Sequence, residues 1–199
     1  LNATTFGWQL GINDRDVYLH TLPQFHCNGW GVLYAVTGMG AQHIILRKID
    51  GTEILRRVQQ HGVTVMCAAP AVANAILDAA GHWEGPVPGR DRVRIVCAGA
   101  PPPTKTIERI ETELGWEFIQ IYGLTETSPT LTLNRPDAYR FDTVGKVVPS
   151  VEVKLDVDGE ILARGESVFS GYFKDPGATA AAFTDDGWFR TGDVGRFTE

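Results

Sequence analysis

The sequence predicts an α/β fold, a mostly parallel sheet flanked by helices, followed by a small β-rich, barrel-like subdomain. Two observations predict it. Apolar runs of strand length alternate with helical patterns over residues 16–122, and short segments after residue 144 alternate apolar and polar residues. The first pattern is typical of βαβ units with helices on both sheet faces, and the second of half-buried antiparallel strands. We therefore expect residues 1–140 to form an α/β subdomain and residues 141–199 a β-rich one, joined by the polar, proline-containing loop 134–142.

In the first subdomain the strands are expected at residues 17–21, 42–46, 63–67, 93–97 and 117–121. The helices are expected at residues 28–36, 52–60, 71–80 and 104–114. The helix over 52–60 has the clearest pattern, because Ile54, Leu55 and Val58 share one face.

In the second subdomain we expect strands at residues 144–148, 151–155 and 160–164, with a turn at 156–159. A short helix over 176–183 begins with a proline, which suits the first helical turn. Further short strands are expected at residues 188–190 and 194–198.

Composition and charge narrow the class of protein. The 199 residues carry a net charge of −6, which argues against nucleic acid as the main partner. The longest mostly apolar stretch, residues 63–77, is too short and interrupted to span a bilayer, and no signal peptide is visible. We expect a cytoplasmic protein, with peripheral membrane association and oligomer formation left open. The three widely spaced cysteines, Cys27, Cys67 and Cys97, are expected as buried free thiols.

Three segments should meet at one edge of the predicted sheet. Ligands of open α/β sheets bind beyond the carboxyl ends of the strands. That rule places residues 23–28, 98–103 and 122–128 at the same rim, so we expect them to converge there.

The segment Tyr-Gly-Leu-Thr-Glu-Thr-Ser at residues 122–128 could contact a nucleotide. Gly123 lets the backbone turn sharply, hydroxyls can bond phosphate oxygens, and a carboxylate can hold a Mg²⁺ that bridges phosphates. The aromatic ring of Tyr122 can stack on a base. The residues alone leave a second interpretation open, a capped turn whose side chains satisfy backbone groups.

Three further segments carry candidate chemistry, each with a structural alternative. Gly99, in Gly-Ala-Pro-Pro-Pro, allows close backbone approach or simply connects a strand to a helix. His26, in Pro-Gln-Phe-His-Cys-Asn-Gly-Trp, could hold a carboxylate through an imidazole N–H or serve the fold. Asp193, in Gly-Trp-Phe-Arg-Thr-Gly-Asp, could accept two hydrogen bonds at once or only form a turn.

In their order along the chain, the four segments resemble the motifs of the adenylate-forming superfamily, which includes acyl-CoA synthetases, peptide-synthetase adenylation domains and beetle luciferases. All four fixed positions of the family pattern Tyr-Gly-x-Thr-Glu are present at residues 122–126. The resemblance implies that Tyr122 stacks on adenine, that Thr125 bonds the α-phosphate, and that Glu126 ligates Mg²⁺. It implies that Asp193 holds the ribose hydroxyls. The residues that it implies for the nucleotide are Gly99, Ala100, Pro101, Gln120, Tyr122, Gly123, Thr125 and Asp193.

The resemblance also indicates an acid-binding side. His26 would lie near the acyl carboxylate and act in catalysis with Thr125 and Glu126, and Trp30 resembles an aromatic gate of the acyl tunnel. Gly99 and Gly123 would border the substrate. Amino-acid-activating relatives usually carry an aspartate near the position of His26, so an amino-acid substrate is not expected.

The activity implied is that of an ATP-dependent acid–CoA ligase, which adenylates a carboxylic acid, expected to be fatty, and transfers the acyl group to CoA. ATP, Mg²⁺ and coenzyme A are the implied cofactors and co-substrates. The alternatives are an adenylation domain serving a carrier protein, a luciferase-like enzyme and a catalytically silent nucleotide-binding module. The family's phosphate-binding loop would precede Leu1, and its lid domain with a catalytic lysine would follow Glu199. We therefore expect the segment alone to have negligible ligase activity.

Overall fold

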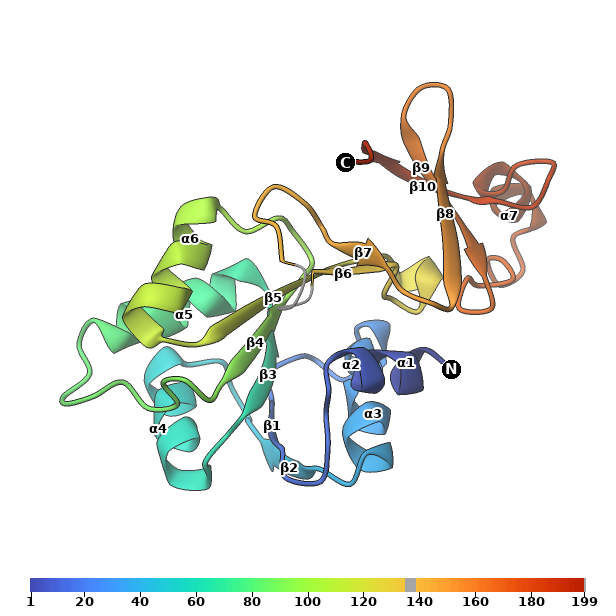
Figure 1. The fold of residues 1–199 in the computed structure, drawn as a ribbon. Coiled ribbons are helices and arrows are strands. Elements are labelled where there is room, and N and C mark those ends of the chain that lie inside the picture. Colours follow the sequence, from blue (N-terminus) through green and yellow to red (C-terminus); the bar gives the residue numbers. More distant parts are fainter. Residues whose placement is uncertain (135–138, 199) are drawn as a thin grey trace.

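The computed structural model describes residues 1–134 and 139–198 and contains a seven-stranded sheet with the order β2-β1-β3-β4-β5-β6-β7 (Figure 1). Five strands are parallel: β1 (Val17–His20), β2 (Gln42–Ile45), β3 (Val65–Ala68), β4 (Arg94–Cys97) and β5 (Glu117–Tyr122). Two antiparallel strands, β6 (Thr132–Asn134) and β7 (Lys146–Val147), extend the sheet beyond β5. The predicted mostly parallel sheet is confirmed. β6 was not anticipated, because three residues are too few to show an alternating pattern.

Helices cover both faces of this sheet. On one face lie α1 (Asn2–Gln9), the single turn α2 (Cys27–Trp30) and α3 (Val32–Gly38). On the other lie α4 (Gly51–His61), α5 (Pro70–Ala80) and α6 (Thr104–Arg109). Successive residues of β3 alternate between the two cores: Val65 and Cys67 belong to the first, Met66 and Ala68 to the second. The strands are therefore buried on both faces, as parallel strands usually are.

Two local features explain why α4 forms where the periodicity predicts a helix. The Asp50 carboxylate accepts a hydrogen bond from the Glu53 backbone N–H (2.8 Å), which caps the amino terminus. Gly62 ends the helix in a left-handed conformation. A Cβ on Gly51 would lie 2.1 Å from the Ala75 carbonyl oxygen, so the absence of a side chain lets α4 pack closely on α5.

Three helix predictions differ from the structure. The helix expected over 28–36 is divided into α2 and α3, because Gly29, Trp30 and Gly31 have positive φ angles that a right-handed helix excludes. The helix expected over 104–114 continues after α6 as a π-helical turn over residues 110–114. α1 was missed, since its stability comes from burying Phe6 rather than from local periodicity.

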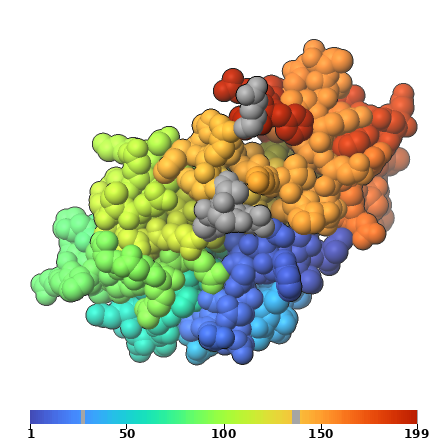
Figure 2. Space-filling model, in the orientation of Figure 1, coloured from blue at the N-terminus to red at the C-terminus, as the bar shows by residue number. Residues whose placement is uncertain are grey.

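The second sheet is antiparallel and has three strands, with β9 (Glu160–Gly165) between β8 (Val151–Leu155) and β10 (Phe189–Val194). The helix α7 (Pro176–Ala182) begins at Asp175, whose carboxylate accepts from the Ala178 N–H (2.9 Å). In the space-filling view, the residues coloured orange and red gather at one end of the molecule (Figure 2).

Two strand predictions for this part differ from the structure in their details. The strand expected at 144–148 is β7, which pairs with β6 in the large sheet and not in the small one. The separate strands expected at 188–190 and 194–198 are one strand, β10, whose register shifts between Arg190 and Val194. The division into domains after residue 140 stays a prediction.

Two of the three cysteines lie in the core of the sheet. Cys67 and Cys97 are free and buried, and burial raises the pKa of the Cys67 thiol to about 12. Thiols in this state are structural and chemically inert. The side chain of Cys27 lies outside the described residues.

An ion pair joins the amino-terminal ends of three strands. The Asp16 carboxylate, just before β1, accepts hydrogen bonds from the Arg94 guanidinium, from the Thr64 hydroxyl (2.7 Å) and from the Asn13 N–H (2.9 Å). Burial alone would raise the pKa of Asp16, but these hydrogen bonds outweigh it and hold the pKa below its usual value. The cluster therefore stabilises the fold at the edge opposite to the one where the motifs lie.

We expect Thr64→Val to destabilise the protein by about 1 kcal/mol at neutral pH, because the hydroxyl that donates to Asp16 is lost. A carboxyl pKa that is lowered by folding contributes stability above the ordinary carboxyl pKa, and this stability is lost as the pH falls through the folded pKa. The difference between variant and wild type should therefore shrink below about pH 4. Urea unfolding at several pH values measures it, with Thr52→Val on the exposed face of α4 as control. A difference that does not change with pH would contradict the role of Asp16.

Candidate functional site

The three segments expected at one rim do meet at the carboxyl ends of β1, β4 and β5. They surround a pocket of about 280 Å³, called the rim pocket below. It is lined by His26, Trp30, Ala98, Gly99, Ile121, Gly123, Leu124, Thr125, Glu126 and Pro129. The convergence that the sheet topology predicts is therefore present.

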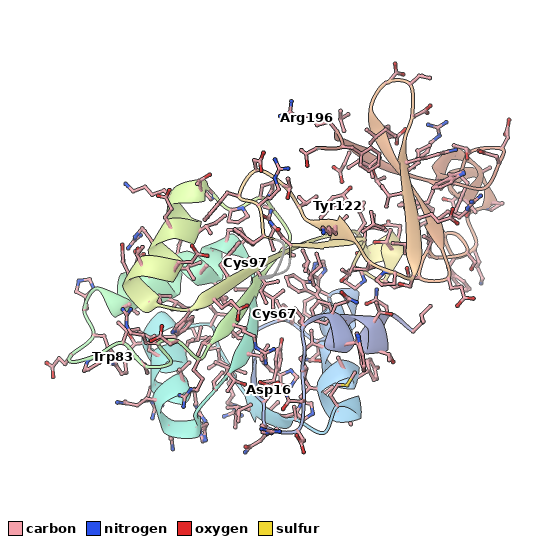
Figure 3. The ribbon with its side chains drawn as sticks, in the orientation of Figure 1. Asp16, Cys67, Trp83, Cys97, Tyr122 and Arg196 are labelled. Carbon is pink, nitrogen blue, oxygen red and sulfur yellow. The ribbon has the colours of Figure 1, made fainter. Side chains whose placement is uncertain are left out.

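A second pocket of about 670 Å³, the cleft pocket, lies between the β5–β7 edge of the large sheet and the small sheet. Tyr122 and Pro101 line it from the large-sheet side, and Asp193 and Arg196 from the side of the small sheet. Figure 3 labels Tyr122 and Arg196 on these two sides. The wider lining includes Thr132, Arg140, Thr143, Lys146, Val147, Val153, Leu155, Ile161 and Phe197.

The turn after β5 separates the two pockets and has a tight internal structure. The buried Thr127 hydroxyl accepts from the Leu124 N–H (2.9 Å) and lies 2.7 Å from the Pro129 carbonyl oxygen, to which it donates. A Cβ on Gly123 would lie 1.5 Å from the same carbonyl oxygen. The capped-turn interpretation therefore applies to Thr127. Thr125 and Glu126 line the rim pocket instead, and their contact with a nucleotide stays a prediction.

Glu126 connects this turn to the small subdomain. Its carboxylate accepts a hydrogen bond from the Tyr172 hydroxyl (3.1 Å), and its backbone carbonyl accepts from the Phe169 N–H (2.7 Å). The hydrogen bond to Glu126 raises the pKa of Tyr172. No local sequence pattern could have revealed this contact, since the partners are 46 positions apart.

The donor set at Glu126 fits a Mg²⁺ ion that is shared with a phosphate. Within residues 1–134 and 139–198, no group of three or more histidine, cysteine or acidic side chains could enclose a metal ion. Mg²⁺ is typically held by one or two carboxylates together with substrate phosphates and water. Glu126 can supply one such carboxylate oxygen at the edge of the rim pocket.

A hydrogen bond crosses the cleft pocket from Tyr122 to Asp193. The Tyr122 hydroxyl donates to Asp193 Oδ2 at 2.7 Å, and the Asp193 backbone N–H donates to the Thr191 hydroxyl at 3.1 Å. Burial, and then the nearby Asp193 carboxylate, raise the pKa of Tyr122 well above its usual value. The phenol therefore stays a neutral donor, and two motifs 71 positions apart come into direct contact.

The loop after β4 lies at both pockets. Gly99 has a φ of +91°, and a Cβ built there would meet no atom within 4 Å, so its backbone is accessible from the rim pocket. Pro101 lines the cleft pocket, whereas Ala100 is exposed and lines neither. Gln120 is buried within β5 opposite Asn134 and also lines neither pocket. The contacts that the resemblance implies for Ala100 and Gln120 stay predictions.

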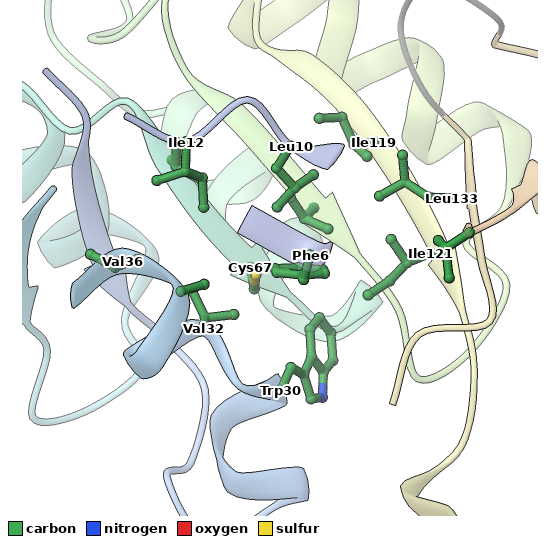
Figure 4. Packing of buried hydrophobic residues seen from close by; sticks show 14 of the residues in the cluster. Phe6, Leu10, Ile12, Trp30, Val32, Val36, Cys67, Ile119, Ile121 and Leu133 are labelled. Atoms are coloured by element: carbon green, nitrogen blue, oxygen red, sulfur yellow. The ribbon is translucent and has the colours of Figure 1, made fainter. Parts of the chain in front are cut away.

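His26 and Trp30, the residues that the resemblance implies for the acid, both line the rim pocket. His26 is exposed and lines the rim pocket, while its backbone N–H donates to the Pro23 carbonyl (3.2 Å). Trp30 is only 6% exposed and packs in the same cluster as Phe6 and Val32, which Figure 4 shows at close range. Trp30 is therefore at once a core residue and a wall of the pocket.

A parallel α/β sheet with two pockets on either side of one turn at its carboxyl edge is typical of α/β folds that bind a ligand there. The sequence pattern of the AMP-binding enzyme family matches residues 1–173. This chain belongs to that family. One curated relative and one solved structure are named as CoA ligases or synthetases, and a second structure is named as an N-terminal domain.

The chain is 38% identical to a 2-methylpropanoate–CoA ligase, CCL4, from Humulus lupulus, over 93% of this chain and 37% of that protein. Its structure is similar to that of the N-terminal domain of FACL13 from Mycobacterium tuberculosis, with a TM-score of 0.89, 26% identity, and coverage of 100% of this chain and 52% of the other. It is also similar to an O-succinylbenzoate CoA synthetase from Bacillus subtilis in complex with ATP and magnesium ion, with a TM-score of 0.83, 27% identity, and coverage of 97% and 42%. The chain thus spans about 37% of the length of the curated relative.

In the part of the chain that the structure describes, no helix combines the length and apolar character needed to cross a membrane.

Proposed function

We propose that this chain is the part of an ATP-dependent acid–CoA ligase that holds the acyl adenylate. The observation that carries the proposal is the placement of the rim and cleft pockets about the turn after β5. Tyr122 lines the cleft pocket, whereas Ile121 and Gly123 line the rim pocket, in keeping with the alternation of side chains along a strand. A ligand with an acyl group in one pocket and adenosine in the other would place its phosphate at this turn.

Each side chain has a role that its position supports. The ring of Tyr122 would lie against adenine, and the Asp193 carboxylate would accept hydrogen bonds from the ribose hydroxyls. The Thr125 hydroxyl would donate to the α-phosphate. His26 would hold the carboxylate of the acid, so that it lies close to the phosphorus it attacks.

The reaction proposed for the whole protein has two steps. A carboxylate oxygen of the acid attacks the α-phosphorus of ATP, and pyrophosphate leaves. The thiolate sulfur of CoA then attacks the acyl carbonyl carbon, and AMP leaves. Bound Mg²⁺ would neutralise part of the phosphate charge, with Glu126 as its protein ligand.

The proposed substrate is an apolar carboxylic acid, in keeping with the apolar walls that Trp30, Ile121 and Leu124 contribute to the rim pocket. The relatives are named for acids of different shape, 2-methylpropanoate and O-succinylbenzoate. A fatty acid is one member of this class and stays a proposal. The proposed compartment is the cytoplasm, which imaging of the tagged full-length protein would test.

Binding of a sulfamoyl analogue of 2-methylpropanoyl adenylate, the acyl-adenylate mimic, tests the proposal by calorimetry. We expect the chain to bind the mimic more tightly than AMP, and Thr125→Ala to weaken mimic binding by about 10-fold, the usual cost of a lost hydrogen bond to a charged group. Thr52→Ala on the exposed face of α4 is the matched control. No binding of either ligand, or equal binding by Thr125→Ala, would refute the assignment.

Pyrophosphate release tests the second part of the proposal. We expect the 199-residue chain to release negligible pyrophosphate from ATP, Mg²⁺ and acids of several lengths, whereas the full-length protein turns over. A single missing electrostatic donor typically costs about 10²-fold to 10³-fold in rate. Turnover by the chain at the full-length rate would contradict this expectation.

Ala98→Leu should change which acids are accepted. Ala98 lines the rim pocket, and three added carbon atoms would occupy part of its volume of about 280 Å³. We expect a mimic with a benzoyl group to bind about 10-fold more weakly, and AMP binding to change by less than about 2-fold, because Ala98 does not line the cleft pocket proposed for adenosine. Ala71→Leu, at an exposed position of α5, is the control. Equal loss for AMP and mimic would show that the rim pocket does not receive the acid.

A further inference from the structure

A chain of four hydrogen bonds runs from the loop of the rim pocket to α3. The Gln24 amide nitrogen lies 3.1 Å from His20 Nδ1, and His20 Nε2 lies 2.8 Å from His43 Nδ1. His43 Nε2 lies 3.1 Å from the Thr37 hydroxyl, which donates to the Leu33 carbonyl at 2.8 Å. His20 ends β1 and His43 belongs to β2, so two neighbouring strands supply the centre of the chain.

The contact between Thr37 and Leu33 determines which atom is the donor in the hydrogen bonds that follow. The single hydroxyl proton of Thr37 is donated to the carbonyl of Leu33, so the Thr37 oxygen accepts from His43 Nε2. His43 Nδ1 is then an acceptor and receives the proton of His20 Nε2. His20 Nδ1 accepts from the Gln24 amide. In this arrangement each imidazole carries a proton on Nε2.

The surroundings of His20 support the neutral form. The side chain is 6% exposed, and the edge of its ring faces Tyr18, with the ring centroids 4.7 Å apart. Burial, together with the adjacent His43, lowers the pKa of His20 to about 4. The His20 ring is thus uncharged at neutral pH.

At the other end of this hydrogen-bond network, His20 contacts Gln24, an exposed residue of the loop itself. The Gln24 amide nitrogen lies 3.1 Å from His20 Nδ1, and the same amide lies beside Gly29, where an added Cβ would be 3.0 Å from Oε1. The neighbouring Phe25 side chain is 91% exposed and does not anchor the loop. Gln24 therefore supports the segment that carries His26 and Trp30, both of which line the rim pocket.

We propose that His20 and His43 are positioning residues of the acid side: through Gln24 they hold residues 23–30, so that His26 and Trp30 keep their places in the rim pocket. This inference rests on the proposed function, which assigns the acid to the rim pocket. It differs from a purely stabilising role, which would affect both pockets alike or neither.

Gln24→Met tests this difference by ligand binding, since methionine has a similar length but no amide. We expect the affinity for the acyl-adenylate mimic to fall by about 10-fold and that for AMP to stay within about 2-fold, because His26 and Trp30 line the rim pocket and no residue of 23–30 lines the cleft pocket. His43→Ala should act in the same direction. Gln60→Met, at an exposed position of α4, is the control. Equal losses for both ligands, or no loss for either, would overturn the proposal.

Nitrogen NMR of the histidine rings gives a test that needs no ligand. We expect His20 and His43 to be protonated on Nε2 at neutral pH, and Gln24→Met to shift both the His20 Nδ1 signal and the Trp30 indole N–H signal. His82→Ala, in the exposed segment after α5, should move neither. Protons on Nδ1, or an unmoved Trp30 signal, would overturn the proposal. If the wild type binds no ligand, the proposed function fails, and this measurement still decides whether the histidines hold the loop.

Discussion

Gly123→Ala is expected to destabilise the fold by about 3 kcal/mol or more, the upper part of the range for overpacked sites. The added Cβ would lie 1.5 Å from the Pro129 carbonyl oxygen and 3.0 Å from the Leu131 backbone nitrogen. Both are backbone atoms, so no side-chain rotation can make room. The turn must therefore open, and Thr125 and Glu126 would move away from the rim pocket. Urea unfolding measures the stability, and calorimetry should show loss of binding of the acyl-adenylate mimic.

Gly38→Ala provides the matched control for this substitution. Gly38 ends α3 with an ordinary backbone conformation, and a Cβ there would meet no atom within 4 Å. Since alanine has a higher helix propensity than glycine, we expect a gain of up to about 1 kcal/mol. Similar stabilities for the two variants would show that the turn does not have the tight geometry described here.

Asp193→Asn is expected to weaken binding of both AMP and the acyl-adenylate mimic by about 100-fold, as for the loss of charge-assisted hydrogen bonds. The carboxylate can accept from two ribose hydroxyls, whereas the asparagine nitrogen can only donate. Stability should change little, because Asp193 is exposed and the amide oxygen can still accept from the Tyr122 hydroxyl. Calorimetry with both ligands and urea unfolding separate the two effects.

Asp158→Asn is the control for Asp193→Asn, because Asp158 is an exposed carboxylate in the turn between β8 and β9. Its substitution should leave both affinities within about 2-fold. If Asp193→Asn also stayed within this range, the ribose would not lie at Asp193, and the assignment of the cleft pocket to the nucleotide would be wrong.

The sequence determined the main sheet and the edge at which the motifs meet. Apolar runs such as residues 93–97 have the length of a strand, and helical patterns separate them by short connections. This alternation is enough to predict that neighbouring strands run parallel, as β3 and β4 do. Once the strands are parallel, their carboxyl ends share one edge, so the segments that contain His26, Gly99 and Thr125 had to come together.

Only the tertiary structure decided the contacts between distant positions. β7 joins the large sheet because β6 offers an unpaired edge, and no pattern within residues 146–147 distinguishes that partner from β8. The hydrogen bond from Tyr122 to Asp193 joins positions 71 residues apart in the chain. That between His20 and His43 joins positions 23 residues apart. Local periodicity predicts on which face of its helix or strand a side chain lies. The residue that this side chain contacts depends on how the elements pack together.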